Sequence, residues 1–192
     1  MNKLTAQEEK IVKSHAFAQI MSSQVNKDGF AEISYCPLQL LDNNKFLGHL
    51  ARNNPLFKVI NDTSMVKVIF SGPHGYISPR WHSEQVVPTW NYASVSLTCN
   101  INIINSSSEK LQAMQSLSKH FDPQWSFNEF NREGNERMVQ QMLSAITVFT
   151  LDIVDVKSKF KLSQQRSTAC REALQNNLKL TGYPELAEIQ LW

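Results

Sequence analysis

The sequence predicts an α+β fold, in which an antiparallel sheet carries helices at its ends and one helical excursion. Two observations favour this class. Closely spaced turns between short apolar segments are typical of a meander rather than of βαβ units. Residues 89–104 also alternate apolar with small polar side chains, as in one long strand, and a segment with helical spacing follows them directly.

The predicted strands are apolar or β-branched segments bounded by turns. Asp28-Gly29 supplies the positive φ angles that a tight hairpin requires. Further turns are predicted at residues 42–44 and 71–73, and Asn53-Asn54-Pro55 breaks the chain because the residue before proline avoids the helical region. The strands are expected at 30–41, 45–50, 65–70, 76–78, 89–104 and 147–156.

Helical spacing and capping residues predict the helical parts of the chain. Thr5 can cap a first helix, and residues 16–22 either extend that helix or begin a strand. Because we find no repeat, low-complexity segment or linker, we expect a single domain over residues 1–192 with a helical C-terminal tail. Helices are predicted at 5–15, from 106 onward, at 134–146 and after 167.

Composition excludes several classes of protein. With 42% hydrophobic and 19% charged residues, the 192-residue chain has a globular balance. Its net charge of +2 gives no general attraction to nucleic acid or an anionic membrane. We expect no secretion signal, no membrane span and a cytoplasmic location with free thiols, since no CxxC pair occurs among Cys36, Cys99 and Cys170.

The first segment that could carry chemistry runs from Gly48 to Pro55, where a strand is expected to end. Gly48 allows another group to approach the backbone closely, and His49 and Arg52 would face the same way on a short helical turn. A planar guanidinium beside exposed backbone amides is suited to binding phosphate. A solvated strand end with a surface arginine is the alternative that the residues leave open.

The second segment, residues 70–92, is rich in aromatic residues, proline and glycine. We expect a rigid loop whose aromatic side chains wall a planar ligand, with Asn91 able to donate and accept hydrogen bonds at a ring edge. An ordered loop whose aromatic residues cover the core is the alternative, and both roles can hold together.

The third segment, residues 159–166, is a cationic strand end. Alternation places Lys159, Lys161 and Ser163 on one face and anchors the other through Phe160 and Leu162. Such a face suits a phosphate or the polar edge of a planar ring. A solvated edge strand protected by lysines is the alternative.

Common catalytic and metal signatures are missing from the sequence. We find no GxGxxG, P-loop, HExxH or GxSxG motif, and the spacing of His74 and His82 matches no common zinc pattern. We therefore expect no metal site and assign no catalytic residue.

Four motifs in a fixed order resemble a known family, the PaiB-like FMN-binding negative transcriptional regulators. The similarity runs from about residue 15 to about residue 170. The motifs are Gly48-His49-Leu50-Ala51-Arg52-x-Asn54-Pro55, Gly72-Pro73-His74-x-Tyr76-Ile77-Ser78-Pro79-x-Trp81, Val87-Pro88-Thr89-Trp90-Asn91-Tyr92 and Lys159-Phe160-Lys161-Leu162-Ser163-Gln164-x-Arg166.

This resemblance implies an antiparallel split β-barrel, like that of pyridoxamine phosphate oxidases, with peripheral helices. It also implies FMN as the cofactor, held at the subunit interface of a homodimer. The residues expected near the FMN phosphate are Gly48, His49 and Arg52, and those expected near the ring or the partner chain are Asn91, Lys161, Ser163, Gln164 and Arg166.

Two departures from the family pattern bear on flavin binding. Residues 33–37 match only loosely, and Ser158 stands where a glycine is expected ahead of the last motif. The serine could shift a turn there. Either change could weaken binding of the flavin, whereas the fold should tolerate both.

Three functions remain open from the sequence. The first is an FMN-binding negative transcriptional regulator or redox sensor, although no helix-turn-helix signal or basic charge supports direct contact with DNA. The second is a flavin-dependent oxidoreductase, such as a flavin reductase or a pyridoxamine phosphate oxidase-like enzyme, in which the cofactor carries the chemistry. The third is haem binding or degradation, for which the candidate ligands are His15, His49, His74, His82 and His120.

Overall fold

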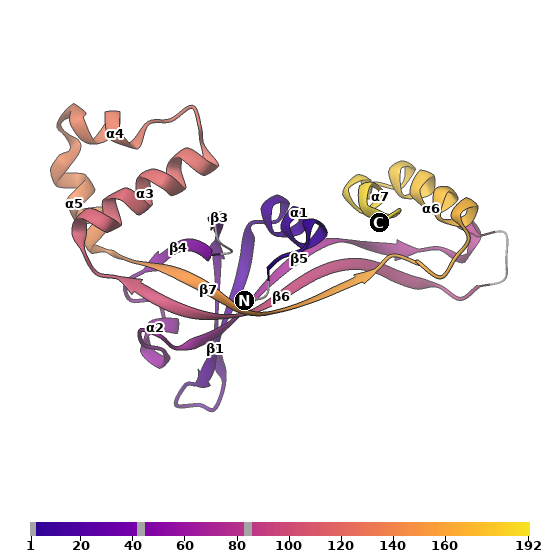
Figure 1. Cartoon of the computed structure of the whole chain (residues 1–192), viewed down its shortest axis with the longest axis horizontal. Coiled ribbons are helices and arrows are strands. Elements are labelled where there is room, and N and C mark those ends of the chain that lie inside the picture. The colour runs from indigo at the N-terminus through magenta and orange to yellow at the C-terminus, as the bar shows by residue number, and fades with distance from the viewer. Residues whose placement is uncertain (1–2, 42–44, 83–85) are drawn as a thin grey trace.

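The computed structural model describes residues 3–41, 45–82 and 86–192, and a seven-stranded antiparallel sheet forms its centre (Figure 1). The strands follow the order β2-β1-β5-β6-β7-β4-β3 across the sheet, which confirms the predicted α+β class. The predicted turn at 42–44 lies outside the described residues. The strands are β1 (Phe17–Val25), β2 (Ala31–Pro37), β3 (Gln39–Leu41), β4 (Lys45–Ala51), β5 (Met65–Ile77), β6 (Thr89–Ile104) and β7 (Ile146–Lys161).

The sheet closes into a barrel because consecutive strands lie at its two opposite edges. β2 ends at Pro37 and β3 begins at Gln39, so the chain passes from one edge to the other through Leu38 alone. The Leu38 N–H donates to the carbonyl oxygen of Ala16 (2.9 Å), and the Cys36 thiol donates to that of His49 (3.2 Å). The single strand predicted over 30–41 was therefore wrong, because the crossing at Leu38 divides it in two.

Apolar side chains from the concave face of the sheet fill this barrel. Phe46 and Phe70 pack with their ring centroids 5.2 Å apart, and Phe149 is buried with them. Burial of three phenylalanines and the surrounding aliphatic residues supplies the hydrophobic stabilisation of the closed part of the sheet.

Strands β5, β6 and β7 continue beyond the closed part as a long arm (Figure 1). β6 covers the residues that alternation predicted, whereas the turn predicted at 71–73 was wrong because β5 passes through it. Gly72 and Pro73 form a bulge there, marked by the register shift between Ser71 and His74. A bulge absorbs an extra residue without ending the strand, which is also where proline is tolerated.

Seven α-helices occur in the described residues, and the longer ones match the predicted segments. After Ala16 the chain begins strand β1 rather than extending the first helix, α6 and α7 lie in the predicted helical tail, and the short helices α2 and α4 were not predicted. The helices are α1 (Ala6–Ser14), α2 (Leu56–Val59), α3 (Ser107–Phe121), α4 (Phe127–Phe130), α5 (Glu136–Ser144), α6 (Thr168–Leu180) and α7 (Pro184–Ile189).

A capping box fixes the start of helix α1, and the Glu8 carboxylate of this box also joins the helix to the sheet. The Thr5 hydroxyl accepts from the Glu8 N–H, and the Thr5 N–H donates to the Glu8 carboxylate (2.7 Å). Burial alone would raise the pKa of Glu8, but hydrogen bonds from Thr5 and from Ser158 of β7 outweigh it and hold the pKa below its ordinary value. Ser158 thus lies inside a strand rather than in a turn, and joins β7 to α1.

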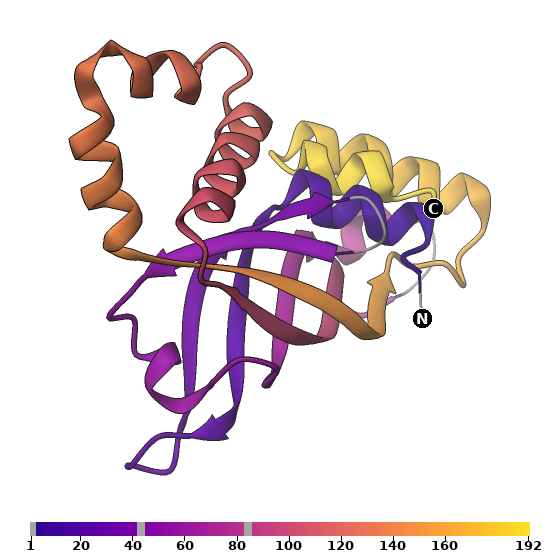
Figure 2. The ribbon, with the colours of Figure 1, turned by 60° about the vertical axis from the view of Figure 1, so that its left-hand side comes forward.

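The described helices cover one side of the arm and leave its other side without a helix. α1, α6 and α7 lie along the same side of β5, β6 and β7, while α3, α4 and α5 form the excursion between β6 and β7 (Figures 1 and 2). No helix in the described part of the chain has the length and apolar character needed to cross a membrane.

Candidate functional site

We call the bare side of the arm, together with the surface of β1 and β2 that continues it across the sheet, the outer face. It is built from directly opposed residues of neighbouring strands. Opposed residues of antiparallel strands point to the same face. One row across the sheet therefore presents, from β2 to β7, Tyr35, Gln19, Ile69, Ser96 and Lys157. The outer face passes from apolar side chains at one edge, through small hydroxyl residues, to a cationic edge.

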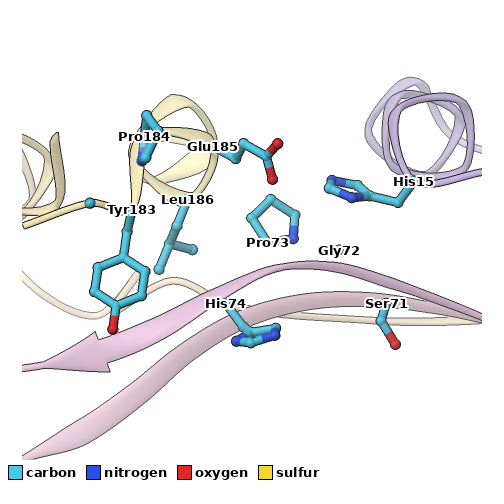
Figure 3. A pocket seen from close by; sticks show the side chains of 10 residues that line it. His15, Ser71, Gly72, Pro73, His74, Tyr183, Pro184, Glu185 and Leu186 are labelled. Carbon is cyan, nitrogen blue, oxygen red and sulfur yellow. The ribbon is translucent and has the colours of Figure 1, made fainter.

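Aromatic side chains gather on the outer face towards the end of the arm. The His74 ring stacks on the Trp90 ring with centroids 6.0 Å apart, and Tyr76 meets Trp90 edge-on at 6.4 Å. The Trp90 side chain is nevertheless 46% exposed. Figure 3 shows Ser71 and His74 on the side of β5 away from α7, because the bulge at Gly72 and Pro73 turns both side chains outward.

Lysines from β7 border this aromatic cluster. Lys161 lies opposite Tyr92 and Lys159 lies opposite Ser94, so both ammonium groups share the face that carries Trp90. The Lys161 Nζ donates to the Thr89 hydroxyl (2.6 Å), and both lysines are exposed. Aromatic rings beside cations match the two needs of FMN, which has a planar ring system and a phosphate dianion.

Gly48 lies at a close approach inside the barrel. A Cβ built on Gly48 would lie 2.6 Å from the Leu38 Cδ2 and 3.2 Å from the Cys36 Sγ. The glycine thus leaves room for the crossing at Leu38 that closes the barrel. Its role in phosphate binding stays a prediction.

His49 points out of the barrel towards the helical excursion. It borders a hollow of about 210 Å³ together with Met114, Leu117, Phe121 and Trp125. Burial lowers the pKa of His49 below its ordinary value, and its Nδ1 is buried without a hydrogen-bond partner in the described residues. This hollow is smaller than the roughly 300–1,000 Å³ usual for ligand pockets, so it gives no support to haem binding.

Arg52 follows β4 directly, and its side chain is exposed. Its backbone N–H donates to the carbonyl oxygen of Ala145 (2.8 Å), which fixes this turn against the end of the excursion. The guanidinium is therefore anchored at its backbone and open to solvent, as an anion receptor requires.

Asn91 is fully buried and faces the helices rather than the outer face. Its Nδ2 donates to the Ser163 hydroxyl (3.1 Å) and to the Gln190 Oε1 (3.2 Å), and the Ser163 hydroxyl can donate to the Asn91 Oδ1. The Gln190 Nε2 in turn donates to the Leu162 carbonyl oxygen (2.6 Å). This network ties the end of β7 and the chain terminus to β6. It uses both polar groups of the Asn91 side chain, which was expected to bind the edge of a planar ligand.

Gln164 and Arg166 lie in the turn that follows β7. The Gln164 side chain accepts from the Leu162 N–H and donates to the Phe160 carbonyl oxygen, so it closes this turn locally. The Arg166 N–H donates to the Ser163 carbonyl oxygen (3.0 Å), with Ser163 at a φ of 58°. Both residues thus shape the connection between β7 and α6.

The predicted site residues fall into two groups at opposite ends of the molecule. His49 pairs with Val148 near the start of β7, and Lys161 ends that strand thirteen residues later. At about 3.3 Å per residue, the two ends of this stretch are roughly 40 Å apart along the strand. β7 spans most of the long axis of the molecule (Figure 1), so one FMN cannot reach both groups of a single chain.

A separate hollow of about 530 Å³ lies on the helical side of the arm, between α1, the β5 bulge and α7 (Figure 3). His15 and Glu185 face it from opposite sides, with Pro73 between them. His15 and His74, two of the candidate haem ligands, line this hollow, whereas none of the residues expected to bind FMN lines it. Among the described residues, no group of three or more His, Cys, Asp or Glu side chains could hold a metal ion.

A family model described as "Putative FMN-binding domain" matches residues 2–155. The chain belongs to this family. The match confirms the resemblance carried by the motifs, and with it FMN as the cofactor. It includes Gly48, His49, Arg52 and Asn91, but it ends before the last motif.

Similar proteins agree with this assignment. The chain is 27% identical over 159 residues to the protease synthase and sporulation protein PAI 2 of Bacillus subtilis, covering 81% of this chain and 75% of that protein. A FAD and haem binding protein from Mycobacterium smegmatis superposes with a TM-score of 0.59 at 13% identity, over 83% of this chain and 72% of that one. The flavocytochrome Anf3 of Azotobacter vinelandii gives 0.58 at 16% identity, over 79% and 64%. The fold is thus the predicted split β-barrel.

Sequence reasoning missed the outer face as a unit. Tyr76 and Trp90 were expected at the starts of two strands joined by a rigid loop, and His74 in a loop, whereas His74 and Tyr76 lie together on β5, directly beside Trp90 of β6. The alternation of residues in β6 does indicate this arrangement. It places Trp90 and Tyr92 on the face opposite to the buried series that begins with Asn91 and Ala93.

Proposed function

We propose that two copies of this chain bind FMN between them, and that the bound flavin makes the protein a redox-responsive regulator. Each FMN would contact the Gly48–Arg52 strand end of one copy and the outer face of the other. The chain would thus be a homodimer in which neither copy holds a complete site.

The separation of the two groups of residues carries this proposal. Arg52 and Lys161 are cations at opposite ends of β7, yet one phosphate and one ring system need both a cation and an aromatic wall. A two-fold dimer with the two arms antiparallel would bring one end of each copy to the other end of its partner, and would form two equivalent sites. The same arrangement would cover apolar side chains of the outer face, such as Phe17 (66% exposed) and Tyr35 (56% exposed).

The chain's own residues would bind and orient the cofactor. The exposed Arg52 guanidinium would pair with the phosphate, and the neutral His49 beside it would donate or accept a hydrogen bond without adding charge. Trp90 and His74 would pack against the ring system, with Lys159 and Lys161 close to its polar edge. Bound flavin supplies reversible electron transfer, which is the chemistry that a redox sensor needs.

A regulatory output is supported by the relative described as a protease synthase and sporulation protein. The net charge of +2 gives no general attraction to DNA, so the output would pass through a protein partner or a local contact rather than through a basic surface. A cytoplasmic location with free thiols suits such a sensor.

Titration with FMN, followed by quenching of flavin fluorescence, tests the binding site. The Arg52→Ala variant should bind FMN roughly tenfold to a hundredfold more weakly, as expected when a charge-assisted hydrogen bond is lost. Arg132→Ala is the matched control, because Arg132 is also exposed but lies on the excursion between α4 and α5. If the Arg52→Ala and Arg132→Ala variants bind FMN with equal affinity, Arg52 does not belong to the FMN site.

One observation favours a second candidate, a flavin-dependent oxidoreductase. His74 lies on the outer face in ring contact with Trp90, and therefore next to the proposed position of the flavin ring, where its imidazole would be placed to transfer a proton. Turnover of reduced nicotinamide by the FMN-loaded protein, lost in His74→Phe with FMN affinity retained, would establish this activity. If the bound flavin is reduced only once per site, without turnover, the result would exclude the oxidoreductase and favour the redox-responsive regulator.

A further inference from the structure

Cys170 and His82 form a contact between two parts of the chain that are far apart in sequence. The Cys170 Sγ lies 3.1 Å from the His82 Nδ1. His82 follows the short 3-10 helix at Pro79–Trp81, and Cys170 stands in the first turn of α6, so the contact joins the end of the arm to the C-terminal helices. An imidazole at this distance can take the proton of the thiol.

The position of Cys170 in α6 adds to the effect of the imidazole. Ser167 caps the helix, and its hydroxyl accepts from the Cys170 N–H (3.3 Å). The first turn of a thirteen-residue helix presents the positive end of its dipole, which stabilises a thiolate. Cys170 is only partly buried, so a small reagent can reach its sulfur.

The other two cysteines provide an internal contrast. Cys36 and Cys99 are fully buried in the barrel, and burial raises the pKa of each thiol to about 12. The Cys36 thiol is also engaged with the His49 carbonyl oxygen. Both thiols are structural, inert to reagents in the folded protein.

From this contact we infer that Cys170 is a site of thiol–disulfide exchange, with His82 as its base and a low-molecular-weight disulfide as its substrate. The inference does not rest on the proposed function, because neither residue belongs to the flavin site.

The exchange balances without a further oxidant. His82 takes the proton of the Cys170 thiol, and the thiolate attacks one sulfur of the small disulfide. A bond forms between the Cys170 sulfur and that atom, the disulfide bond of the reagent breaks, and the departing thiolate carries away its electron pair. That thiolate then takes the proton from His82, so the products are a mixed disulfide on Cys170 and one free small thiol.

The first test compares each cysteine in the folded and the urea-unfolded full-length protein, using oxidised glutathione and peptide mass spectrometry at pH 7. Because the His82 imidazole lies 3.1 Å from the sulfur and can take its proton, folded Cys170 should react about threefold to thirtyfold faster than unfolded Cys170. Cys36 and Cys99 should show the reverse order and react only when unfolded. A folded Cys170 that reacts more slowly than its unfolded form would overturn the inference.

The second test removes the base. His82→Asn should remove the part of this acceleration that the imidazole supplies and slow the reaction of folded Cys170 with oxidised glutathione, whereas His120→Asn, on α3, should leave the rate unchanged. Circular dichroism and continued protection of Cys36 and Cys99 would show that the variant is folded. An unchanged Cys170 rate in folded His82→Asn would also overturn the assignment of His82 as the base.

Discussion

Replacing Gly48 with alanine places a methyl group where the barrel closes. The new Cβ would lie 2.6 Å from the Leu38 Cδ2, closer than carbon atoms approach, and 3.3 Å from the Phe149 Cε2. The Leu38 side chain would have to move, although it is 1% exposed and its backbone is held by Ala16. Overpacking of this kind costs about 1–3 kcal/mol of the free energy of unfolding.

Thermal and urea unfolding of the Gly48→Ala variant measure this cost. For a chain of this size, each kcal/mol lowers the melting temperature by about 2–4 °C. The FMN affinity of the folded variant, measured well below its transition, should match that of the wild type, because the methyl group points into the barrel.

A double-mutant cycle with Leu38→Ala separates packing from other causes. Leu38→Ala alone leaves a cavity and should cost about 2–5 kcal/mol. In the double variant the new methyl group partly occupies that cavity, so the combined loss should fall at least about 1 kcal/mol short of the sum. Additive losses would refute the packing role of Gly48 against Leu38. A Gly48→Ala protein as stable as wild type but unable to bind FMN would also refute it, and would favour a direct role of Gly48 in the flavin site.

Three further predictions concern other parts of the molecule. Asn91→Ala should lower the free energy of unfolding by about 1–3 kcal/mol in urea titrations, because Ser163 and Gln190 lose their buried partner; loss of FMN binding at unchanged stability would contradict this. Glu8→Gln should make the free energy of unfolding depend less on pH below about pH 5. The pKa of Glu8 in the folded protein lies below the ordinary value of 4.5, so the ionised carboxylate stabilises the wild type above that pH and this stabilisation is lost as the pH falls. An equal pH dependence of the unfolding free energy in both proteins would exclude a contribution from Glu8. Tyr35→Glu should shift sedimentation from dimer to monomer by placing charge on the proposed interface, and a dimer of unchanged affinity would move the interface elsewhere.

The sequence predicted most elements because local signals decide them. Thr5 and Glu8 form the capping box that marks the first helix, and the alternation over 89–104 matches β6 at both ends. The failures arose where tertiary contacts override a local signal. Gly72 and Pro73 are usual turn residues, yet here β5 is held through them by its pairing with β6, which resumes at His74. The crossing at Leu38 likewise depends on Ala16, which sequence spacing cannot connect to it.

The candidate site was predictable residue by residue but not as a geometry. The motifs identified the family and its cofactor, and they selected cations at both ends of β7. They could not show that Asn91 turns inward to Ser163 and Gln190, because its last partner belongs to a short helical tail that carries no motif. Nor could they show that Arg52 and Lys161 lie far apart, which requires the length and register of the strand between them.

Mixing two damaged variants tests most directly whether each flavin site is shared between copies. Arg52→Glu and Lys161→Glu should each bind FMN poorly as homodimers, because every site then carries one lesion. After subunit exchange at equal concentrations, each mixed dimer should contain one site with both lesions and one intact site, so about a quarter of all sites should recover wild-type affinity. If both residues instead serve a site within one copy, or do not share a site, mixing recovers no binding, and the account of a flavin held between two copies is contradicted.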